Sequence, residues 1–265
     1  MSTSRMHTIE KALTAAGEVL MRHYGKLRDI EQKADINLVT VADREAEEVV
    51  KRIIRESFPD DSILAEESGA EARGEVRWII DPLDGTTNFA HSTPIFATSI
   101  AVEYKGEVVA AGVENPFYQE RFLASKGEGA TRNGSAIRVS SAPSLSKSLV
   151  ATGFPYDRRE HLDHLLGYWR EFLQRAHGIL RLGSASLDLC WVACGRYDGY
   201  WEERLYPWDT AAGSLIVTEA GGKMSNFHGE PFSHMNRQTL ATNGRIHDEC
   251  LAVLKPTAPA DGPRL

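Results

Sequence analysis

Cysteine is scarce in this chain, and its scarcity excludes one class of fold. The 265 residues include three cysteines. This odd number, without regular spacing, excludes a disulfide framework, so we expect a reducing, cytoplasmic location. Cys190 and Cys194 stand four residues apart on one face of an expected helix. That spacing could serve a metal, but no second pair completes a zinc site, and buried packing is the favoured interpretation.

Long apolar runs and a basic surplus are also missing. No run approaches the roughly 20 apolar residues that cross a bilayer, so no membrane partner is expected. The N-terminal stretch lacks the basic start, apolar core and cleavage site of a signal peptide. The formal net charge of −7 argues against direct nucleic-acid binding, and it suits a protein whose carboxylates are neutralised by cations.

The remaining composition, 42% hydrophobic and 25% charged, is that of an ordinary globular protein. No internal repeat is visible. The pattern predicts an N-terminal α+β half over 1–140 and a C-terminal α/β half over 141–256. It also predicts a flexible, proline-rich tail over 257–265.

The first half shows the pattern of two helices followed by an antiparallel sheet. Apolar residues at 9, 13, 16 and 20 mark an amphipathic helix. A second helix is expected near Thr40, where "TVAD" resembles a capping box. Strands are expected at "SILAE" and "VRWIID", with a polar loop between them, and then as short strands separated by turns from about 95 to 139.

The second half alternates between strands and helices. Strands are predicted at "SLVATG", "GILRLG" and "YDGYWE". Helices are predicted over 157–176, 184–195 and 207–222, the last with a proline at its start and glycines at its end. This alternation is typical of α/β layers.

The stretch "WIIDPLDGTTNF", residues 78–89, ends a buried strand with two carboxylates. Its apolar run puts Asp81 at the carboxyl end of the strand, where α/β sheets commonly bind ligands. Gly85 permits close approach of backbone to a ligand. The residues at 86–88 can cap a following helix, whose free N–H groups would face an anion. Taken alone, Asp81 and Asp84 fit a polar turn in which Asp81 caps the helix.

A polar turn at Asp81 and Asp84 does not explain the other acidic residues found at the ends of predicted elements. Glu66 and Glu67 follow the preceding strand, and Glu202 and Asp209 lie beside tryptophans at other element boundaries. Converging carboxylates repel one another unless a cation lies between them. Oxygen ligands without nearby cysteine or histidine favour Mg²⁺, which typically binds few carboxylates together with a substrate phosphate. The pattern predicts metal-assisted hydrolysis of a phosphate ester.

Three motifs closely resemble the inositol monophosphatase family. They are "EES" at 66–68, "WIIDPLDGTTNF" at 78–89 and "WDTAAGSLIVTEAGG" at 208–222, in the family's order and spacing. "ATGFPY" at 151–156 and "GSASLDL" at 183–189 look like its bacterial members, and the resemblance covers roughly residues 6 to 255. It implies a layered αβαβα sandwich, of mixed α+β and α/β class, of the inositol monophosphatase/fructose-1,6-bisphosphatase type.

The resemblance implies two to three Mg²⁺ ions and assigns their ligands. Glu66, Asp81 and the carbonyl of Leu83 would hold the first ion. Asp81, Asp84 and Asp209 would hold the second, and Glu66 would help to place a weaker third. The family often has a lysine in the loop before the second helix, where this register offers Gln32 with Lys33 beside it; any electrostatic contribution from that loop is therefore in doubt.

The same resemblance assigns catalytic and substrate residues. Asp43 and Thr86 would position and deprotonate the attacking water, although Asp43 by itself fits a helix cap. Glu202 matches an acid that binds an inositol hydroxyl, although by itself it fits a surface acid paired with Arg204. His91 is expected at the rim. The implied substrate site comprises Glu66, Leu83, Asp84, Gly85, Thr86, Gly183, Ser184, Ala185, Glu202 and Asp209.

These residues imply an inositol-phosphate phosphatase that is lithium-sensitive and homodimeric. The first substrate is myo-inositol 1-phosphate, a small phosphorylated polyol. Histidinol phosphate and fructose 1,6-bisphosphate are alternatives, because such enzymes share the metal core and differ at the pocket rim. A different class also stays open, since some bacterial relatives are partners of the transcription machinery.

Overall fold

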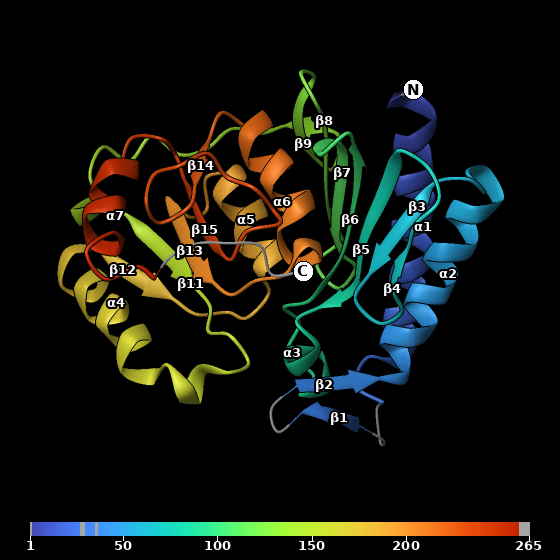
Figure 1. The fold of residues 1–265 in the computed structure, drawn as a ribbon, viewed down its shortest axis with the longest axis horizontal. Coiled ribbons are helices and arrows are strands. Elements are labelled where there is room, and N and C mark those ends of the chain that lie inside the picture. Colours follow the sequence, from blue (N-terminus) through green and yellow to red (C-terminus); the bar gives the residue numbers. More distant parts are fainter. Residues whose placement is uncertain (1, 27–29, 35–36, 260–265) are drawn as a thin grey trace.

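The computed structural model describes residues 2–26, 30–34 and 37–259, and gives side chains from residue 4 onward except over 30–34 and 37–40. Its elements stack in the order helices, sheet, helices, sheet, helices (Figure 1). This layered arrangement confirms the predicted αβαβα sandwich. The predicted boundary at residue 140 stays a prediction, and residues 260–265 of the predicted tail lie outside the described part.

The first helical layer covers one face of the larger sheet. α1 (Ser2–His23) and α2 (Val41–Ser57) pack against each other and against this face, at the right of Figure 1. The predicted apolar positions on α1 are fully buried, as an amphipathic helix on a sheet requires: Ile9, Leu13, Ala16 and Leu20. They form one core cluster with side chains of α2 and the sheet.

The larger sheet contains eight strands, all paired antiparallel except β3 with β5, which confirms the antiparallel sheet predicted for the first half. Across the sheet, the strands are β10 (Ser135–Ala136), β9 (Gly129–Arg132), β8 (Glu120–Ser125), β7 (Glu107–Asn115), β6 (Ala97–Tyr104), β5 (Val76–Asp84), β3 (Ser62–Ala65) and β4 (Gly69–Glu71). A separate antiparallel pair, β1 (Ile30–Ala34) and β2 (Asn37–Thr40), precedes α2 and was not predicted. Strand β4 lies where a polar loop was expected, because that segment pairs with β3.

Strand β5 carries the first motif and extends further than predicted. The sequence placed its end at Asp81, but pairing with β6 resumes at Asp84, opposite Ala97, after an irregularity in register. Pro82 has no N–H to give to the ladder, and its carbonyl accepts a hydrogen bond of 3.0 Å from the hydroxyl of Thr98. The two aspartates therefore flank an irregularity within a buried strand.

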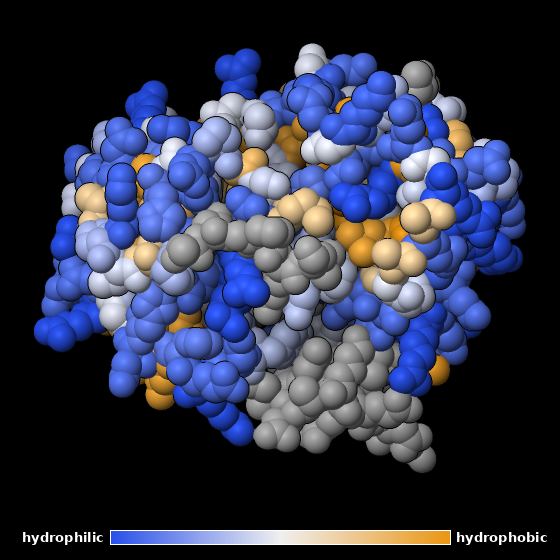
Figure 2. Space-filling model, viewed as in Figure 1, coloured by the Kyte–Doolittle hydropathy of each residue, from blue (hydrophilic) through white to orange (hydrophobic). Residues whose placement is uncertain are grey.

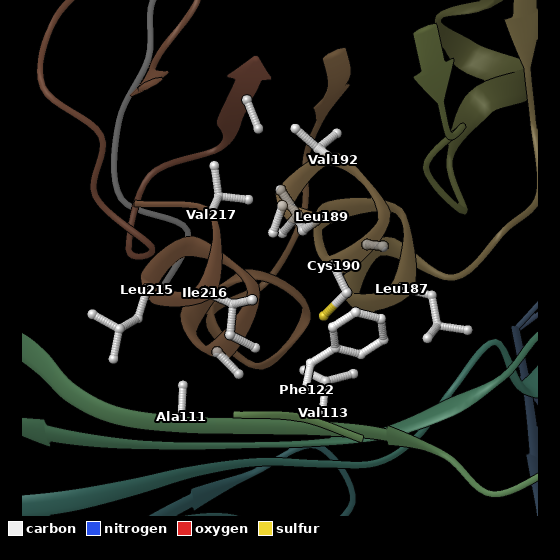
Figure 3. Packing of buried hydrophobic residues seen from close by; sticks show 14 of the residues in the cluster. Ala111, Val113, Phe122, Leu187, Leu189, Cys190, Val192, Leu215, Ile216 and Val217 are labelled. Carbon is white, nitrogen blue, oxygen red and sulfur yellow. The ribbon is translucent and has the colours of Figure 1, made fainter. Parts of the chain in front are cut away.

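The middle layer consists of α5 (Ala185–Ala193) and α6 (Pro207–Glu219), which pack against each other and against the larger sheet. Every residue of α5 is buried, as expected for a helix covered on several sides. Figure 3 shows Cys190 pointing toward the ring of Phe122 on the sheet. Cys190 is a free, buried thiol, which confirms its predicted packing role, and Cys194 is free and half-buried.

The smaller sheet contains five strands, in the order β12 (Gly178–Leu180), β11 (Leu149–Thr152), β13 (Gly199–Glu203), β15 (Gln238–Thr242) and β14 (Lys223–Ser225). α4 (Leu162–Arg175) and α7 (His247–Leu254) form the last layer, at the left of Figure 1. The ring of Phe172 on α4 stacks on Trp201 of β13, with centroids 5.1 Å apart. These side chains belong to a third core cluster.

Two predicted helices are shorter in the structure. The helix expected over 157–176 begins with a separate 3-10 turn, Arg158–Glu160, so that the α-helix starts at Leu162. The helix expected over 207–222 ends at Glu219, because Gly221 adopts a left-handed backbone with φ of 85°. Among the described residues, no helix combines the length and apolar content of a membrane span.

The face shown in Figure 2 is mostly hydrophilic, and its apolar residues form small separate groups. The apolar side chains are instead concentrated in the three core clusters between the layers. Packing between layers therefore supplies most of the hydrophobic stabilisation of this fold.

We predict that Phe122→Ala destabilises the protein by about 3–5 kcal/mol, the usual cost of removing a buried aromatic side chain. Phe122 is fully buried in the cluster of Figure 3. Phe117→Ala is the matched control, because Phe117 is 42% exposed. Urea unfolding of the three proteins measures the effect, and equal losses for both variants would contradict the assigned core.

Candidate active site

Acidic residues from separate segments of the chain lie around one buried cavity. Asp81 and Asp84 come from β5, Glu66 follows β3, and Asp209 lies in the first turn of α6. The cavity has a volume of about 50 Å³, enough for a few groups the size of water. Its walls consist of Glu66, Asp81, Leu83, Asp84, Gly85, Thr86, Tyr156, Tyr206, Trp208 and Asp209. The structure thus brings together all the metal ligands predicted from the sequence.

Asp81 is the most deeply buried of these acids, with 1% of its surface exposed. Its Oδ1 accepts a hydrogen bond of 3.0 Å from the N–H of Leu83. Burial raises the pKa of Asp81 well above its ordinary value, and the negative charges of Glu66, Asp84 and Asp209 raise it further. The site therefore resists holding several ionised carboxylates unless a cation compensates them.

Asp84 is fixed by the start of α5. Its Oδ2 accepts hydrogen bonds from the hydroxyl of Ser184 and from both the N–H and the hydroxyl of Ser186, at 2.5–2.7 Å. Burial nevertheless raises the pKa of Asp84, because these donors offset only part of the desolvation. The sequence placed Ser184 in a loop lining the substrate ring; the structure instead points its hydroxyl at Asp84, and Ser186 was missed.

Asp209 is held in the same manner by its own helix. The N–H of Tyr206, just before α6, donates to Asp209 Oδ2 at 2.6 Å. Burial raises the pKa of Asp209 well above its ordinary value, and the negative charges of Asp84 and Glu66 raise it further. Asp81, Asp84 and Asp209 are each anchored through one oxygen by donors of the chain, which fixes their direction toward the cavity.

This set of donors fits a hard divalent cation. All the charged groups at the cavity are carboxylates, the ligand type that Mg²⁺ and Ca²⁺ prefer, and histidine and cysteine do not line it. Among the described residues, however, no three acidic, histidine or cysteine side chains form a group that could already hold a metal ion. Cation binding therefore requires these carboxylates to draw closer than they stand in the structure. Their shared cavity and their mutual effects on pKa mark them as the groups that would do so.

Asp43 and Thr86 form the pair that the resemblance implied. The hydroxyl of Thr86 lies 3.1 Å from Asp43 Oδ1 and 3.0 Å from the carbonyl oxygen of Leu83. Asp43 is buried in the first turn of α2. Because the side chain of Thr40 is outside the described part, the predicted capping box stays a prediction. The side chains of Gln32 and Lys33, on β1, are outside it as well.

Gly85 makes the sharp turn between β5 and α3 (Thr86–Ala90). Its φ of 92° is left-handed, and a Cβ atom there would lie 2.8 Å from the carbonyl oxygen of Ile95, so glycine alone fits. The residues at 86–88 lie inside this short helix and do not cap it, contrary to prediction. The amide of Asn88 instead donates to the carbonyl of Leu182 at 2.8 Å, which ties the motif to the loop before α5.

A larger cavity of about 570 Å³ opens from the acidic one and shares with it Asp84, Gly85, Thr86, Tyr156, Tyr206 and Asp209. Gly183, Ala185 and Glu202 line it, as predicted, and His91 lies there as the expected rim residue, whereas Ser184 does not. The sequence analysis missed Gly153, Phe154, Pro155, Arg158 and Arg181, which also line it. For the first four, the sequence signal was the motif "ATGFPY" and the residues directly after it, whereas Arg181 lies just before the motif "GSASLDL".

Glu202 is oriented by a residue of its own strand, β13, and by the segment that follows β11. Only 7% of its surface is exposed, and the hydroxyl of Tyr200 donates a hydrogen bond to its Oε2. A Cβ atom on Gly153 would overlap the Glu202 carboxylate, so glycine at 153 makes room for it. Arg204 binds Asp157. The interpretation of Glu202 as a surface acid paired with Arg204 is therefore wrong.

Asp188 on α5 is a buried acid that the sequence analysis did not single out. Only 1% of its surface is exposed, and neither carboxyl oxygen has a hydrogen-bond partner in the described structure. Burial raises the pKa of Asp188 well above its ordinary value, and the charge of Glu202 adds to this effect. The charge of Arg181 opposes the shift only in part, so Asp188 holds its proton more strongly than an exposed aspartate does.

Another groove has a similar volume, about 580 Å³, and lies between α1 and strands β7 and β8. Its single arginine, Arg121, is already bound to Glu114 at 2.7 Å and to Thr14. It lacks the cluster of mutually perturbed carboxylates that marks an active site. The acidic cavity and its extension are therefore the candidate active site.

Comparison with known proteins gives consistent results along the chain. Residues 3–257 match the model described as the inositol monophosphatase family. The chain is 46% identical to the inositol-1-monophosphatase of Synechocystis, over 93% of this chain and 87% of that protein. It is also 42% identical to the Nus factor SuhB of Pseudomonas aeruginosa, over 94% and 95% of the two chains. The solved inositol monophosphatase from Anabaena superposes with a TM-score of 0.88 at 43% identity and covers 97% of both chains.

We predict that Asp81→Asn stabilises the metal-free protein at alkaline pH. A carboxyl whose pKa is raised by folding leaves stability intact below its ordinary value of 3.8, and stability is lost as pH rises toward the raised value. The asparagine oxygen can still accept the Leu83 N–H but carries no charge. In EDTA, the variant should melt at a higher temperature than the wild type at roughly pH 8, and the difference should shrink near pH 4.

Asp60→Asn is the control, because Asp60 is exposed and remote from the cavity. It should melt with the wild type at both pH values. A lower melting temperature for Asp81→Asn than for the wild type at alkaline pH would show that carboxylate repulsion does not destabilise the folded protein.

Proposed function

Because the chain belongs to the inositol monophosphatase family and is a phosphatase of that family, we propose that it releases phosphate from a small phosphorylated polyol in a Mg²⁺-dependent reaction. The first candidate substrate is myo-inositol 1-phosphate. The observation that carries this proposal is the convergence of Glu66, Asp81, Asp84 and Asp209 on one cavity that continues into a pocket for a small molecule. A pocket of about 570 Å³ lies within the range of typical small-ligand sites.

The cation ligands in this proposal are those that the family resemblance implies, and all of them line the acidic cavity. Glu66, Asp81 and the Leu83 carbonyl would hold one ion, and Asp81, Asp84 and Asp209 would hold a second, with Glu66 helping to place a weaker third. When bound, Mg²⁺ lowers the pKa of coordinated water and neutralises charge on the phosphate and the leaving oxygen. Lithium sensitivity belongs to the same proposal, since a small cation could compete at the position held by Asp81, Asp84 and Asp209.

The attacking water is positioned by Thr86 and Asp43. The Thr86 hydroxyl already donates toward Asp43 Oδ1, over 3.1 Å. It can therefore accept a proton from water at Oγ1 while it passes its own proton to the Asp43 carboxylate. The buried position of Asp43 keeps this proton path away from bulk solvent.

The substrate ring lies in the larger cavity in this proposal. Glu202 accepts a hydrogen bond from a ring hydroxyl, and Gly183 and Ala185 also line this cavity. Tyr200 and Gly153 hold the Glu202 carboxylate in place from behind. These contacts favour a polyol but do not by themselves select inositol over histidinol phosphate or fructose 1,6-bisphosphate.

A role beside transcription factors is the second candidate, because relatives that are 40–42% identical are named Nus factor SuhB. In that case, a separate protein-binding surface would work beside the phosphatase site. A pull-down from host lysate with wild type and Asp81→Asn, with and without Mg²⁺, separates the two functions. A homodimer and a cytoplasmic location complete the proposal, and sedimentation and cell fractionation test them.

We predict that Asp81→Asn loses nearly all turnover of myo-inositol 1-phosphate. Asp81 contacts both proposed ions, so its loss should exceed the roughly 10–100-fold cost of disturbing an outer-shell partner of a metal. Phosphate release at saturating Mg²⁺ measures the effect, with Asp60→Asn as the control. Wild-type turnover in Asp81→Asn would refute the ligand assignment, and a wild type inactive on every small phosphomonoester would refute the proposed function.

We predict that Glu202→Gln selectively impairs polyol substrates. A hydrogen bond to a charged group contributes roughly 1.5–3 kcal/mol, so its loss lowers kcat/KM by about 10- to 150-fold. Turnover of p-nitrophenyl phosphate, which lacks the ring hydroxyl, should change much less. Gly153→Ala, which displaces the carboxylate, should repeat this pattern more weakly. An equal loss on both substrates would show that Glu202 supports the metal site or the fold.

A further inference from the structure

The walls of the larger cavity differ in charge from one end to the other. The part shared with the acidic cavity carries Asp84 and Asp209. The remaining part carries Arg158, Arg181 and Arg204, and these arginines do not line the acidic cavity. The pocket therefore has a carboxylate end and a guanidinium end, and Glu202, like the arginines, lines the larger cavity but not the acidic one.

Two of these guanidinium groups are available to a ligand. Arg204 is neutralised by its ion pair with Asp157. Arg158 and Arg181 form no ion pair and no side-chain hydrogen bond with any described residue. Other arginines of this acidic chain are paired with carboxylates: Arg5, Arg55, Arg77, Arg121 and Arg196.

The absence of a side chain at Gly183 leaves room for the guanidinium group of Arg181 beside the pocket. A Cβ atom on Gly183 would lie 2.5 Å from the Nη1 of Arg181, so the guanidinium lies against the loop that forms the cavity wall. Arg158 lies in the 3-10 turn Arg158–Glu160, after the "ATGFPY" segment that lines the same cavity. The two cations thus come from separate loops that both border the pocket.

We propose that Arg158 and Arg181 form a second anion-binding position, which holds a phosphate group at the end of the substrate opposite the ester that is cleaved. A phosphate monoester carries close to two negative charges at neutral pH, which two guanidinium groups balance. The planar guanidinium also matches phosphate oxygens in bidentate geometry. This inference rests on the proposed function, because it assumes that the carboxylate end binds the cleaved phosphate.

The test compares two substrates that differ only in the second phosphate. Fructose 1-phosphate and fructose 1,6-bisphosphate are hydrolysed by the full-length protein with Mg²⁺, and the quantity measured is the ratio of their kcat/KM values at the 1-position. The wild type should favour the bisphosphate. Arg158→Gln and Arg181→Gln should each lower this ratio by about 1.5- to fivefold, the range for exposed ion pairs, because hydrolysis of the bisphosphate should fall more than hydrolysis of the monophosphate.

Arg159→Gln is the matched control, because Arg159 is the exposed neighbour of Arg158 and lines neither cavity. It should keep the wild-type ratio. Arg181→Lys should retain part of the preference, and added salt should weaken it in the wild type, because exposed charges are screened. A wild-type ratio at or below unity, or equal losses on both substrates in the arginine variants, would overturn the proposal.

Two further outcomes distinguish a position for a substrate phosphate from a site for a free anion and from a failure of the catalytic proposal. If added inorganic sulfate accelerates fructose 1-phosphate hydrolysis in the wild type but not in Arg181→Gln, the position serves a free anion, and the assignment to a substrate phosphate is wrong. If the wild type hydrolyses neither sugar phosphate, calorimetric binding of the same two ligands replaces the kinetic ratio. Tighter binding of the bisphosphate that is lost in both arginine variants would then support the anion position while the catalytic proposal fails.

Discussion

Repulsion between buried carboxylates is the interaction on which this site depends. Burial raises the pKa of Asp81, and the negative charges of Glu66, Asp84 and Asp209 each raise it further. A fold that only had to be stable would not gather these charges, because isolated buried charges cost several kcal/mol each. Their presence makes sense when a divalent cation converts the repulsion into attraction. The proposed binding of metal and phosphate, and the proposed catalysis, all depend on that conversion.

The layered fold supplies the rigid frame that keeps the carboxylates together. The irregularity in β5 spaces Asp81 and Asp84, the start of α5 holds Asp84 through Ser186, and the first turn of α6 holds Asp209. α5 and α6 are fixed by the core between them and the larger sheet (Figure 3). The candidate active site thus lies where the middle helices meet the end of one buried strand, and the larger cavity extends from there.

Much of this arrangement could be predicted from the sequence, and particular physical reasons explain the rest. Amphipathic spacing predicted α1, and the motif around Asp81 predicted the acidic cavity. The continuation of β5 to Asp84 depends on pairing with Ala97, a partner that is distant in sequence. The role of Ser186 depends on a contact with Asp84, about a hundred residues away in the sequence, and that of Tyr200 follows from the strand geometry that brings it onto the same face as Glu202. Arg158 and Arg181 escaped notice because a single arginine in a loop carries no local signal until the cavity is known.

The most direct test of the central claim is to locate cations in crystals of the protein grown with Mn²⁺, which takes the same oxygen ligands as Mg²⁺. Anomalous scattering would then mark each ion. The account predicts peaks in the cavity bounded by Glu66, Asp81, Asp84 and Asp209, with Asp81 contacting two of them. Peaks confined to other parts of the surface, or an acidic cavity without bound Mn²⁺ at saturating concentration, would contradict it.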